Sequence, residues 1–491
     1  MQKNNPNTIR YITILAGALC FVLPGLNTEI EILYTLSPWI WQACFLYYTR
    51  TIEKKRDWLL FALLFLISHE IRFVEFLGDT EQSFGLIAAL LLVLLSAAAA
   101  IPFFLDWIFQ KYTDRFLMVF VFPLARVGVE RFIIGQQFNL SLTQFGNKWL
   151  IQSAAFLGDK FITFVVALIP SVIIFVILNE GNRKMLRYGI AVLSVFWLIV
   201  LLGGIRYLTG PRPEGAVSMA YASGPQKTYY ENPSETDADY RENVSYLRRT
   251  TRQAAKKGAK LIAYAEEAFM ADGKEVEDIT RAARDCAKEN DIYILICLDC
   301  TTEDGTAENK AVLISNAGEI LSEYLKTNLI PVIEDEYKAG DGVIPSNHIT
   351  IDGREQVVSY TICYDATFSS YLLSMDPATT LFINPSWDWD RIDDLNYRMQ
   401  GISAIESGVV LFKPTVDGWS IVTDPYGRVI YKESTLWGDY NQVHFAEVPG
   451  GSVTTVYQRI HKYTKWTWTL LVLAVLIWLC KIVIAEVRLR K

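Results

Sequence analysis

Eight long apolar stretches constrain the fold of this chain more than any other feature of its sequence. A helix needs about 17–25 mostly apolar residues to cross the hydrocarbon core of a membrane, which is roughly 30 Å thick. The stretches run over residues 10–26, 31–49, 57–77, 84–109, 116–134, 150–178, 186–207 and 466–484. We predict a bundle of seven transmembrane spans over residues 1–210, and a C-terminal transmembrane helix with a short tail over residues 461–491.

Basic residues alternate from one predicted loop to the next, and this alternation predicts the orientation of the spans. Lysine and arginine gather at both ends of the chain and in the second, fourth and sixth loops: Lys3, Arg10, Arg50, Lys54, Lys55, Arg56, Lys111, Arg115, Arg183, Lys184, Arg187, Lys481, Arg488, Arg490 and Lys491. Because basic loops remain in the cytoplasm, we expect both termini there. Residues 211–460 follow the seventh span and should lie on the opposite side of the membrane.

Two clusters of polar residues interrupt the predicted spans, namely His69-Glu70-Arg72 and Arg126-Glu130-Arg131. Ionisable side chains within a span are costly and usually face the protein interior or a water-filled cavity. Alternatively, long side chains near the end of a span can extend to the membrane surface. The sequence leaves both explanations open.

Residues 211–460 differ from the apolar stretches in composition and charge. They contain 23 basic and 39 acidic residues, a net charge of −16, whereas the rest of the chain has a net charge of +9. Strand-like runs alternate there with helix-like runs at 236–258, 275–289 and 391–407. This alternation predicts a layered α/β domain. A nucleic acid is not expected as a partner, because the sequence of this part has no basic stripe.

Four of the seven cysteines lie outside the apolar stretches: Cys286, Cys297, Cys300 and Cys363. Cys297 and Cys300 have the CxxC spacing, but they follow a strand-like run, and no second CxxC or paired histidine supports a zinc site. We therefore predict core thiols or an incidental disulfide, with neither a metal nor a cofactor. Nothing in the chain demands a partner subunit, so we expect a monomer.

Three chemically complementary residues follow separate strand-like runs. Glu266 ends the run that begins at Leu261, Lys326 follows Leu325, and Cys363 follows Ile362. Taken alone, Cys363 is better explained as a buried structural thiol. Strand ends are where catalytic groups gather in layered α/β folds, and a carboxylate, a lysine and a thiol can serve as base, oxyanion donor and nucleophile. The ordered trio therefore predicts acyl-transfer chemistry.

The order and spacing of this trio resemble the nitrilase, or carbon–nitrogen hydrolase, superfamily. Further segments are similar to motifs of that superfamily: Tyr264-Ala265-Glu266, Lys326 with Glu334 eight residues later, Cys363-Tyr364-Asp365, Asn384-Pro385-Ser386-Trp387-Asp388, Ala404-Ile405-Glu406 and Thr423-Asp424-Pro425-Tyr426-Gly427-Arg428. The membrane spans on both sides make the chain similar to the apolipoprotein N-acyltransferase branch. In the membrane part, Phe122-Pro123 with Glu130 and Arg131 is similar to a segment of that branch.

This resemblance implies an α-β-β-α catalytic domain and a catalytic triad of Glu266, Lys326 and Cys363. It implies supporting roles for Glu334, Tyr364, Asp365 and Glu406. The implied reaction moves an acyl chain from a membrane phospholipid, through a cysteine thioester, to the N-terminal amine of an S-diacylglyceryl-cysteine apolipoprotein. The implied location is the bacterial cell (inner) membrane, with the catalytic domain on its extracytoplasmic face.

The sequence departs from the motifs of this branch at three places near the trio. Tyr264-Ala265 stands where the branch has Trp-Pro, Asp365 where it has Glu, and Trp387 where it has Asn. These departures leave the acceptor open. Two other functions therefore remain: a membrane-anchored nitrilase-type amidase or acyltransferase that acts on another lipid or amine, and a non-catalytic binder of lipids or lipoproteins.

Overall fold

The structure is a computed structural model that divides into two compact units, residues 1–209 with 459–491 and residues 210–458. It describes residues 6–26, 30–78, 81–110, 116–134, 139–212, 215–225, 240–331, 333–388, 392–436 and 441–489. Several residues used to predict the orientation of the spans lie outside these ranges: Lys3, Lys111, Arg115, Arg490 and Lys491.

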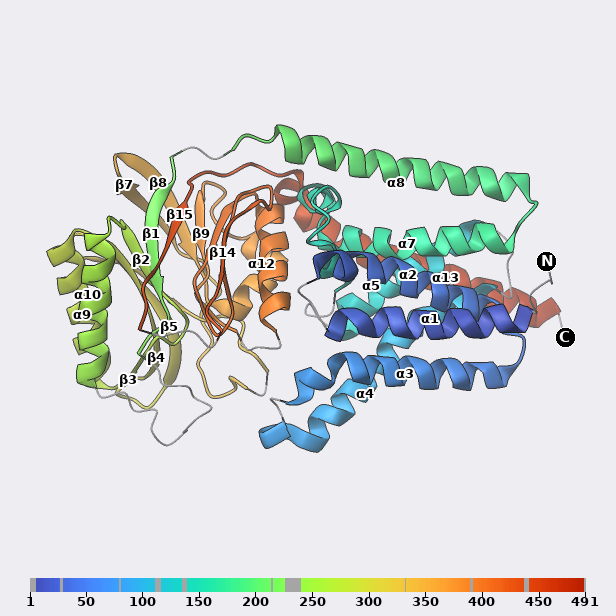
Figure 1. Cartoon of the computed structure of the whole chain (residues 1–491), viewed down its shortest axis with the longest axis horizontal. Helices are drawn as coiled ribbons and strands as arrows, with labels where there is room; N and C mark the ends of the chain where they lie inside the picture. The colour runs from blue at the N-terminus through green and yellow to red at the C-terminus, as the bar shows by residue number, and fades with distance from the viewer. Residues whose placement is uncertain are drawn as a thin grey trace. The chain divides into compact units, whose positions relative to one another are not determined.

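The first unit is helical (Figure 1). Its long helices are α1 (Pro6–Leu26), α2 (Glu31–Arg50), α3 (Lys55–Gly78), α4 (Glu81–Gln110), α7 (Asp159–Leu178), α8 (Arg183–Thr209) and α13 (Val456–Leu489), the last of which begins in the second unit. Large apolar side chains are widely exposed on these helices, for example Ile12 (60%), Leu59 (75%) and Leu208 (69%). Such an apolar exterior is typical of a protein surface that contacts lipid rather than water.

The described residues contain three helices that are long and apolar enough to span a membrane: Leu92–Gln110, Asp159–Leu178 and Arg183–Thr209. A fourth is possible if Val456–Thr464 and Trp466–Ile482, which meet at a 44° bend, form one span. The predicted count of eight is therefore not confirmed. The chain has three candidate spans among its described residues, which is consistent with a membrane protein.

Two of the predicted spans are broken in the structure. The stretch 116–134 consists of a 3₁₀ turn (Phe116–Phe120), the short helix α5 (Val121–Val129) and a π-helical turn (Glu130–Ile134). The stretch 150–178 is interrupted at Gly158, whose φ of +81° is unfavourable for other residues. Apolar composition alone does not reveal these breaks. The first lies at Glu130, whose carboxylate accepts hydrogen bonds from the N–H of Leu140 and the hydroxyl of Thr163. The second lies at a single glycine.

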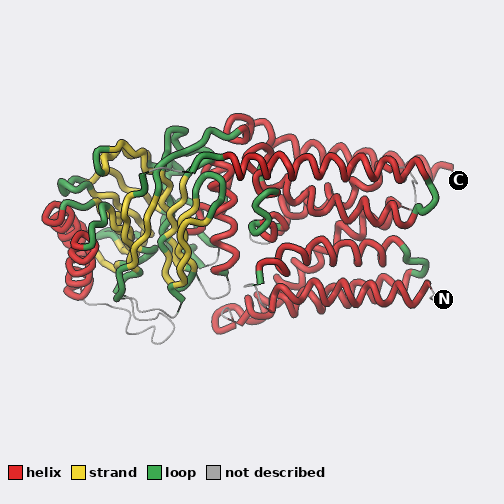
Figure 2. The backbone as a smooth tube through the Cα atoms, turned by 45° about the horizontal axis from the view of Figure 1, so that its top comes forward, coloured by secondary structure: helices red, strands yellow, loops and turns green. Residues whose placement is uncertain are grey.

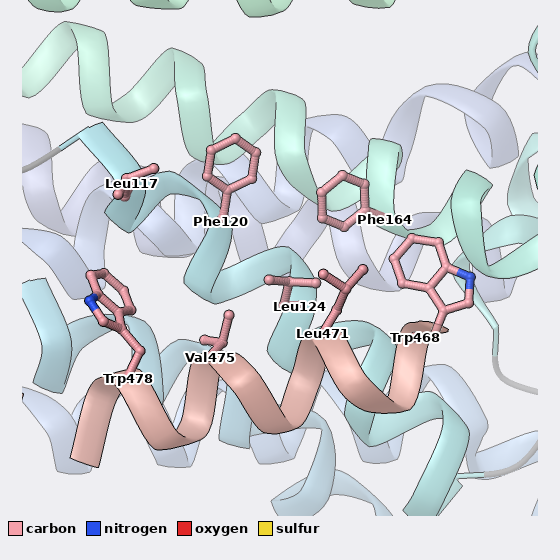
Figure 3. A pocket seen from close by; sticks show the side chains of 8 residues that line it. All are labelled: Leu117, Phe120, Leu124, Phe164, Trp468, Leu471, Val475 and Trp478. Atoms are coloured by element: carbon pink, nitrogen blue, oxygen red, sulfur yellow. The ribbon is translucent and has the colours of Figure 1, made fainter. Parts of the chain in front are cut away.

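An apolar groove of about 490 Å³ runs between α5, α7 and α13 (Figure 3). Its wall is formed by aliphatic and aromatic side chains: Leu117, Phe120, Leu124, Phe164, Trp468, Leu471, Val475 and Trp478. The two tryptophans lie ten residues apart on α13, which places them about 15 Å apart along a helix. The groove thus offers an elongated apolar surface within the helical unit.

The second unit contains two large sheets packed face to face between layers of helices (Figure 2). A third sheet has two short strands, β10 (Ser386–Trp387) and β12 (Thr415–Val416). The first sheet has the order β15-β1-β2-β4-β5-β6, with β3 paired to β4. Its strands are β1 (Val217–Ala222), β2 (Leu261–Tyr264), β3 (Phe269–Asp272), β4 (Tyr293–Thr301), β5 (Ala307–Ile314), β6 (Ile320–Leu325) and β15 (His444–Val448). Helices α9 (Tyr240–Lys256) and α10 (Lys274–Asn290) cover its outer face, where apolar residues of helices and strands form one core.

The second sheet has the order β14-β13-β11-β9-β8-β7. Its strands are β7 (Ser346–Ile351), β8 (Arg354–Tyr360), β9 (Leu381–Ile383), β11 (Val410–Lys413), β13 (Trp419–Thr423) and β14 (Val429–Ser434), and α12 (Asp393–Ser407) packs against β11 and β13. Residues of both sheets form a second core between them, including Tyr221, Leu295, Val358 and Phe412. The predicted α-β-β-α layering of this domain is confirmed.

Candidate active site

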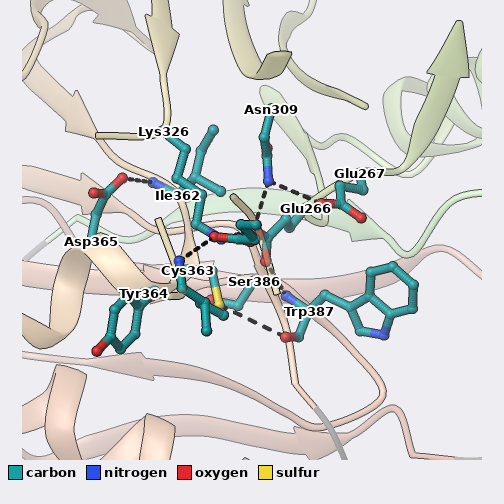
Figure 4. A network of polar contacts seen from close by, with 12 residues as sticks. Glu266, Glu267, Asn309, Lys326, Ile362, Cys363, Tyr364, Asp365, Ser386 and Trp387 are labelled. Atoms are coloured by element: carbon teal, nitrogen blue, oxygen red, sulfur yellow. Dashed lines mark hydrogen bonds and ion pairs between the residues drawn. The ribbon is translucent and has the colours of Figure 1, made fainter. Parts of the chain in front are cut away.

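The three residues of the predicted trio come from different strand ends and are all buried. Glu266 lies two residues after β2, Lys326 directly after β6, and Cys363 three residues after β8. Their exposed fractions are 4%, 1% and 3%. The structure brings them into one network of polar contacts (Figure 4).

Lys326 lies between two carboxylates. Its Nζ donates a hydrogen bond to Glu266 Oε1 at 2.7 Å and a second one to Glu334 Oε1. The other oxygen of Glu334 accepts the backbone N–H of Ile330 at 2.7 Å, which fixes this carboxylate in the same loop. Burial opposes the charge of Lys326, but Glu266, Cys363 and Glu334 together raise the pKa of its ammonium well above the usual value. Lys326 therefore remains charged at neutral pH.

Glu266 is oriented by two further donors that sequence reasoning did not identify. Its Oε1 also accepts a hydrogen bond from Asn309 Nδ2 at 3.0 Å, and its Oε2 accepts the backbone N–H of Trp387 at 2.9 Å. Asn309 belongs to β5 and donates from the same nitrogen to Glu267 Oε1 at 3.1 Å. No sequence spacing pointed to these donors, because they lie 43 and 121 residues from Glu266 along the chain.

Cys363 begins a 3₁₀ turn (Cys363–Thr367) and has a φ of +40°, a strained conformation for a residue with a side chain. Its N–H donates to Pro385 O at 2.8 Å, and its Sγ lies 3.8 Å from Trp387 O (Figure 4). Among the described residues, the next N–H, that of Tyr364, has no acceptor. This geometry exposes a backbone donor beside the thiol, where a negatively charged oxygen could be bound.

Burial, followed by the charge of Glu266, raises the pKa of the Cys363 thiol well above its usual value, and Lys326 opposes this effect. The thiol is therefore neutral in the resting site and needs a base to become a nucleophile. Glu266 is the carboxylate whose charge acts on it most strongly. The arrangement can thus perform nucleophilic catalysis with Glu266 as base and with Lys326 and the Tyr364 N–H as oxyanion donors.

We expect alkylation of Cys363 by iodoacetamide to show the raised pKa directly. Only the thiolate reacts, so the rate at pH 7 should be at least about tenfold lower than that of free cysteine, whose pKa is about 8.5. The rate should still rise above pH 9, where free cysteine levels off. Site-resolved mass spectrometry of the full-length chain measures this rate. A plateau below pH 8 would instead indicate a thiolate stabilised by Lys326.

Asp365 joins the turn of Cys363 to the segment of Lys326. The Tyr324 hydroxyl donates to its Oδ2 at 2.7 Å, and Asn328 donates to its Oδ1 from the backbone (2.6 Å) and from the side chain (2.8 Å). Asp365 Oδ2 also accepts the N–H of Ile362 at 3.3 Å. Burial raises the pKa of this carboxyl, while these donors favour its charged form. Asp365 therefore helps to fix the turn that begins at Cys363.

Replacing Asp365 with asparagine should reduce the free energy of unfolding by about 1–3 kcal/mol, because an amide nitrogen would face donors in a fully buried position. The midpoint of denaturant unfolding of the full-length chain measures this change. Asp304→Asn is the matched control, since Asp304 is exposed and accepts hydrogen bonds only in its own turn. Equal losses in both variants would show that the buried donors do not matter.

The other two predicted supporting residues have different surroundings. Tyr364 is half-buried, and its ring packs edge-on against Phe368 with centroids 5.0 Å apart. Glu406 is fully buried in α12, where its backbone oxygen accepts a hydrogen bond from Thr455 at 2.6 Å. The supporting role of Glu406 remains a prediction.

A second buried ion pair lies near the site and was missed from the sequence. Lys413 Nζ contacts Asp388 Oδ2 at 2.6 Å, both side chains are fully buried, and Asn396 donates to the other oxygen of Asp388 at 2.7 Å. The charges of both residues act on Cys363. Asp388 directly follows Trp387, so this pair anchors the strand that supplies a donor to Glu266.

Glu266, Glu267 and Glu334 place carboxylate oxygens within 4.8 Å of one another, which is the kind of set that can hold a cation. The Lys326 ammonium already binds two of them. Burial and the neighbouring Glu266 and Asp299 raise the pKa of Glu267 well above its usual value, so Glu267 favours its neutral form. The Lys326 ammonium thus already occupies the position of a cation between Glu266 and Glu334.

Cys297 and Cys300 lie on opposite faces of β4. The thiol of Cys297 belongs to the core between the sheets and that of Cys300 to the core beneath the helices. Both are free, and they donate to Tyr264 O and Glu308 O, each at 3.5 Å. Side chains three residues apart in a strand point to opposite faces, so these two are core thiols and form no disulfide with each other.

Comparison with known proteins identifies the family of this domain. Residues 222–455 match the family model of Carbon-nitrogen hydrolase. Similar solved structures include an amidase from Nesterenkonia sp., with a TM-score of 0.42 and 17% identity over 52% of this chain and 99% of that chain. A mutant of the Nesterenkonia sp. AN1 amidase in complex with butyramide has a TM-score of 0.39 and 18% identity, and the match covers 51% of this chain and 96% of that chain. No curated protein sequence matches this chain.

Proposed function

Residues 222–455 form a carbon–nitrogen hydrolase domain, and from this premise we propose that the protein is an N-acyltransferase of lipoprotein maturation. The observation that carries the proposal is the buried network of Glu266, Lys326 and Cys363 in a chain that also has an apolar helical unit. The acyl donor would be a membrane phospholipid. The acceptor would be the N-terminal amine of an S-diacylglyceryl-cysteine apolipoprotein.

In the first step, Glu266 takes the thiol proton and Cys363 Sγ attacks the carbonyl carbon of a phospholipid ester. The new S–C bond forms, the ester C–O bond breaks, and Glu266 returns the proton to the departing lysophospholipid oxygen. Lys326 and the N–H of Tyr364 would stabilise the oxyanion of the tetrahedral intermediate. Loss of one such donor raises the activation free energy by about 3–4 kcal/mol in comparable sites.

In the second step, the neutral amine of the acceptor attacks the thioester. The N–C bond forms, the C–S bond breaks, and Glu266 transfers the amine proton to the departing Cys363 sulfur. Each substrate binds to a different form of the enzyme, so the kinetics should be of the ping-pong type. The Lys326–Glu334 contact would keep the ammonium in place throughout both steps.

The proposed location is the bacterial cell membrane, crossed eight times, with both termini in the cytoplasm and the catalytic domain outside. The apolar exterior of the helices and the alternation of basic loops support this topology. The apolar groove along α13 offers a surface of the kind that an acyl chain contacts. A monomer would suffice, because every residue of the proposed mechanism comes from one chain.

A membrane-anchored amidase is the second candidate, because the matching family is one of hydrolases. Water would then take the place of the amine in the second step. A product assay with and without an acceptor lipopeptide distinguishes the two. An acyltransferase forms N-acylated lipopeptide and little free fatty acid, whereas a hydrolase releases fatty acid or another acid at the same rate in both assays.

Mass spectrometry of lipoprotein N-termini tests the proposed function in cells. In a strain lacking this protein, we expect the N-terminal cysteine to retain its diacylglyceryl group and to have a free amine. A plasmid that supplies the wild-type chain should restore the third acyl chain, and one that supplies the Cys363→Ala chain should not. Unchanged triacylation in the deletion strain would contradict the proposal.

A further inference from the structure

The segment of residues 384–388 contacts both the proposed base and the proposed nucleophile. The N–H of Cys363 donates a hydrogen bond to Pro385 O at 2.8 Å. Trp387 reaches both partners: its N–H donates to Glu266 Oε2 at 2.9 Å, and its carbonyl oxygen lies 3.8 Å from Cys363 Sγ (Figure 4). The alignment of base and nucleophile therefore depends on where this segment lies.

The same segment is held on its other side by a very short strand pair. Strand β10 pairs in parallel with β12. The N–H of Ser386 donates to Pro414 O at 2.9 Å, and that of Asp388 donates to Val416 O at 3.0 Å. A pair of two-residue strands has few hydrogen bonds, so it needs further contacts to keep one position.

The Asp388 carboxylate supplies such contacts through a fully buried ion pair. Its Oδ2 lies 2.6 Å from Lys413 Nζ, and its Oδ1 accepts a hydrogen bond from Asn396 Nδ2 at 2.7 Å. The Lys413 ammonium also donates to Thr415 Oγ1 at 2.6 Å and to Trp419 O at 3.3 Å. All three hydrogens of the ammonium thus have acceptors, which fixes the pair in one arrangement.

The backbone beside this pair leaves room for the carboxylate only because it carries a glycine. A Cβ atom on Gly418 would lie 2.6 Å from Asp388 Cβ and 2.8 Å from Asp388 Oδ2. Both distances are too short for non-bonded atoms, so a larger residue there would displace Asp388. Charge and shape therefore both fix the end of the segment.

Neither stability nor charge alone explains this pair well. A buried ion pair is weak evidence for stability, because the cost of removing two charges from water offsets most of their attraction. Burial is the main cause of the raised pKa of the Cys363 thiol, and the pair acts on that pKa in both directions: Asp388 raises it and Lys413 lowers it. These opposite effects make electrostatic activation of the thiol a poor account of the pair.

We propose that Asp388 and Lys413 are positioning residues that act through Trp387. By fixing the backbone of Trp387, they hold the Glu266 carboxylate in line with the Cys363 thiol. A misplacement of about 1 Å can slow a reaction about 100-fold, so residues that do not react can still control the rate. This role rests on the base and nucleophile of the proposed function, and not on the identity of the acyl donor or acceptor.

Acylation of the full-length chain in detergent by p-nitrophenyl butyrate tests this role, with Cys363→Ala as the background. The burst of nitrophenolate gives the acylation rate constant and the half-saturating ester concentration. We expect Asp388→Asn and Lys413→Met each to lower the rate constant about 10- to 100-fold at an unchanged half-saturating concentration. Lys432→Met is the control and should react like the wild type, because Lys432 is exposed and its Nζ lies over the Trp419 ring at 3.8 Å.

Alkylation of Cys363 by iodoacetamide separates the effect of position from that of charge. Asp388→Asn removes a negative charge that raises the thiol pKa, so alkylation at pH 7 should become faster. Lys413→Met removes a positive charge that lowers this pKa, so alkylation should become slower. If the pair acted on the thiol only through charge, acylation would change in these same opposite directions instead of falling in both variants.

Two further variants separate position from folding. The double variant Asp388→Asn/Lys413→Met leaves no unpaired charge in the core, so its melting temperature should lie close to that of the wild type. Its acylation should remain slow, because the contact that fixes the segment is lost. Gly418→Ala keeps both charges and should slow acylation at an unchanged alkylation rate, since its Cβ would displace Asp388.

Three results would overturn the inference. These are unchanged or opposite changes of the acylation rate constant in the two single variants, recovery of both acylation and stability in the double variant, and a wild-type chain in which the ester does not acylate Cys363. If the variants behave as expected while the wild-type chain forms no acyl-enzyme from phospholipid, the proposed function fails and the positioning role stands.

Discussion

Replacing Cys363 with alanine should abolish the covalent acyl-enzyme and lower acyl transfer by about 10⁴-fold or more, as expected when a nucleophile is removed. The backbone should tolerate the change, because alanine keeps the Cβ atom and faces the same strain at a φ of +40°. The measurement is incubation of the full-length protein with phospholipid labelled in its acyl chains, followed by solvent extraction and quantification of the hydroxylamine-sensitive label on the protein.

Cys297→Ala is the matched control for this experiment, since Cys297 is a fully buried thiol of the same core between the sheets. It should retain the label of the wild-type protein. Retention of thioester-linked label by the Cys363→Ala protein would show that another residue is the nucleophile. Loss of label in both variants would indicate a general effect of thiol removal on this core.

Replacing Lys326 with methionine should have a double effect. Removal of the ammonium leaves Glu266 and Glu334 buried without their cation, which should cost about 3–5 kcal/mol of stability at neutral pH. Loss of an oxyanion donor should also lower acyl-enzyme formation about 100- to 1,000-fold. Thermal unfolding of the full-length chain and the labelling assay measure the two effects separately.

The stability deficit of Lys326→Met should depend on pH. Burial already raises the pKa of the Glu334 carboxyl, and Lys326 opposes this effect. Without the lysine, Glu334 therefore binds a proton more readily in the folded state than in the unfolded chain. Stability of the variant should therefore rise as the pH falls from 7.5 to 5, relative to the wild type. Lys338→Met is the control, because the Lys338 side chain is exposed and its Nζ lies 3.8 Å from Glu308 Oε1. Glu308 keeps a second cation, Lys310, whose Nζ lies 3.3 Å from Glu308 Oε2, so this change should cost little stability.

Lys326→Arg separates charge from geometry. Arginine restores a cation between the carboxylates, so it should recover part of the stability that methionine loses. Its planar guanidinium cannot take the place of a compact ammonium in a fully buried site, so acyl-enzyme formation should remain low. Full activity of the arginine variant would show that charge alone suffices and that Lys326 Nζ need not lie at one defined point.

The sequence predicted the helical unit from apolar composition, and the long helices α2 and α3 occupy the predicted stretches 31–49 and 57–77 to within two residues. Composition could not predict the break near Glu130, because the Leu140 N–H and the Thr163 hydroxyl reach the Glu130 carboxylate only in the folded chain. The sequence also placed Arg50 in a loop. The structure pairs its guanidinium with buried Asp106 at 2.8 Å.

By itself, the sequence singled out the residues to which we assign the proposed chemistry. Glu266, Lys326 and Cys363 follow strand-like runs in the right order, and a layered α/β fold gathers such strand ends. Only the tertiary structure decided how these residues are oriented. Asn309, the Trp387 backbone and the Lys413–Asp388 pair reach the site from distant parts of the chain. Local patterns encode strands and their ends, whereas contacts across tens of residues arise only when the two sheets pack.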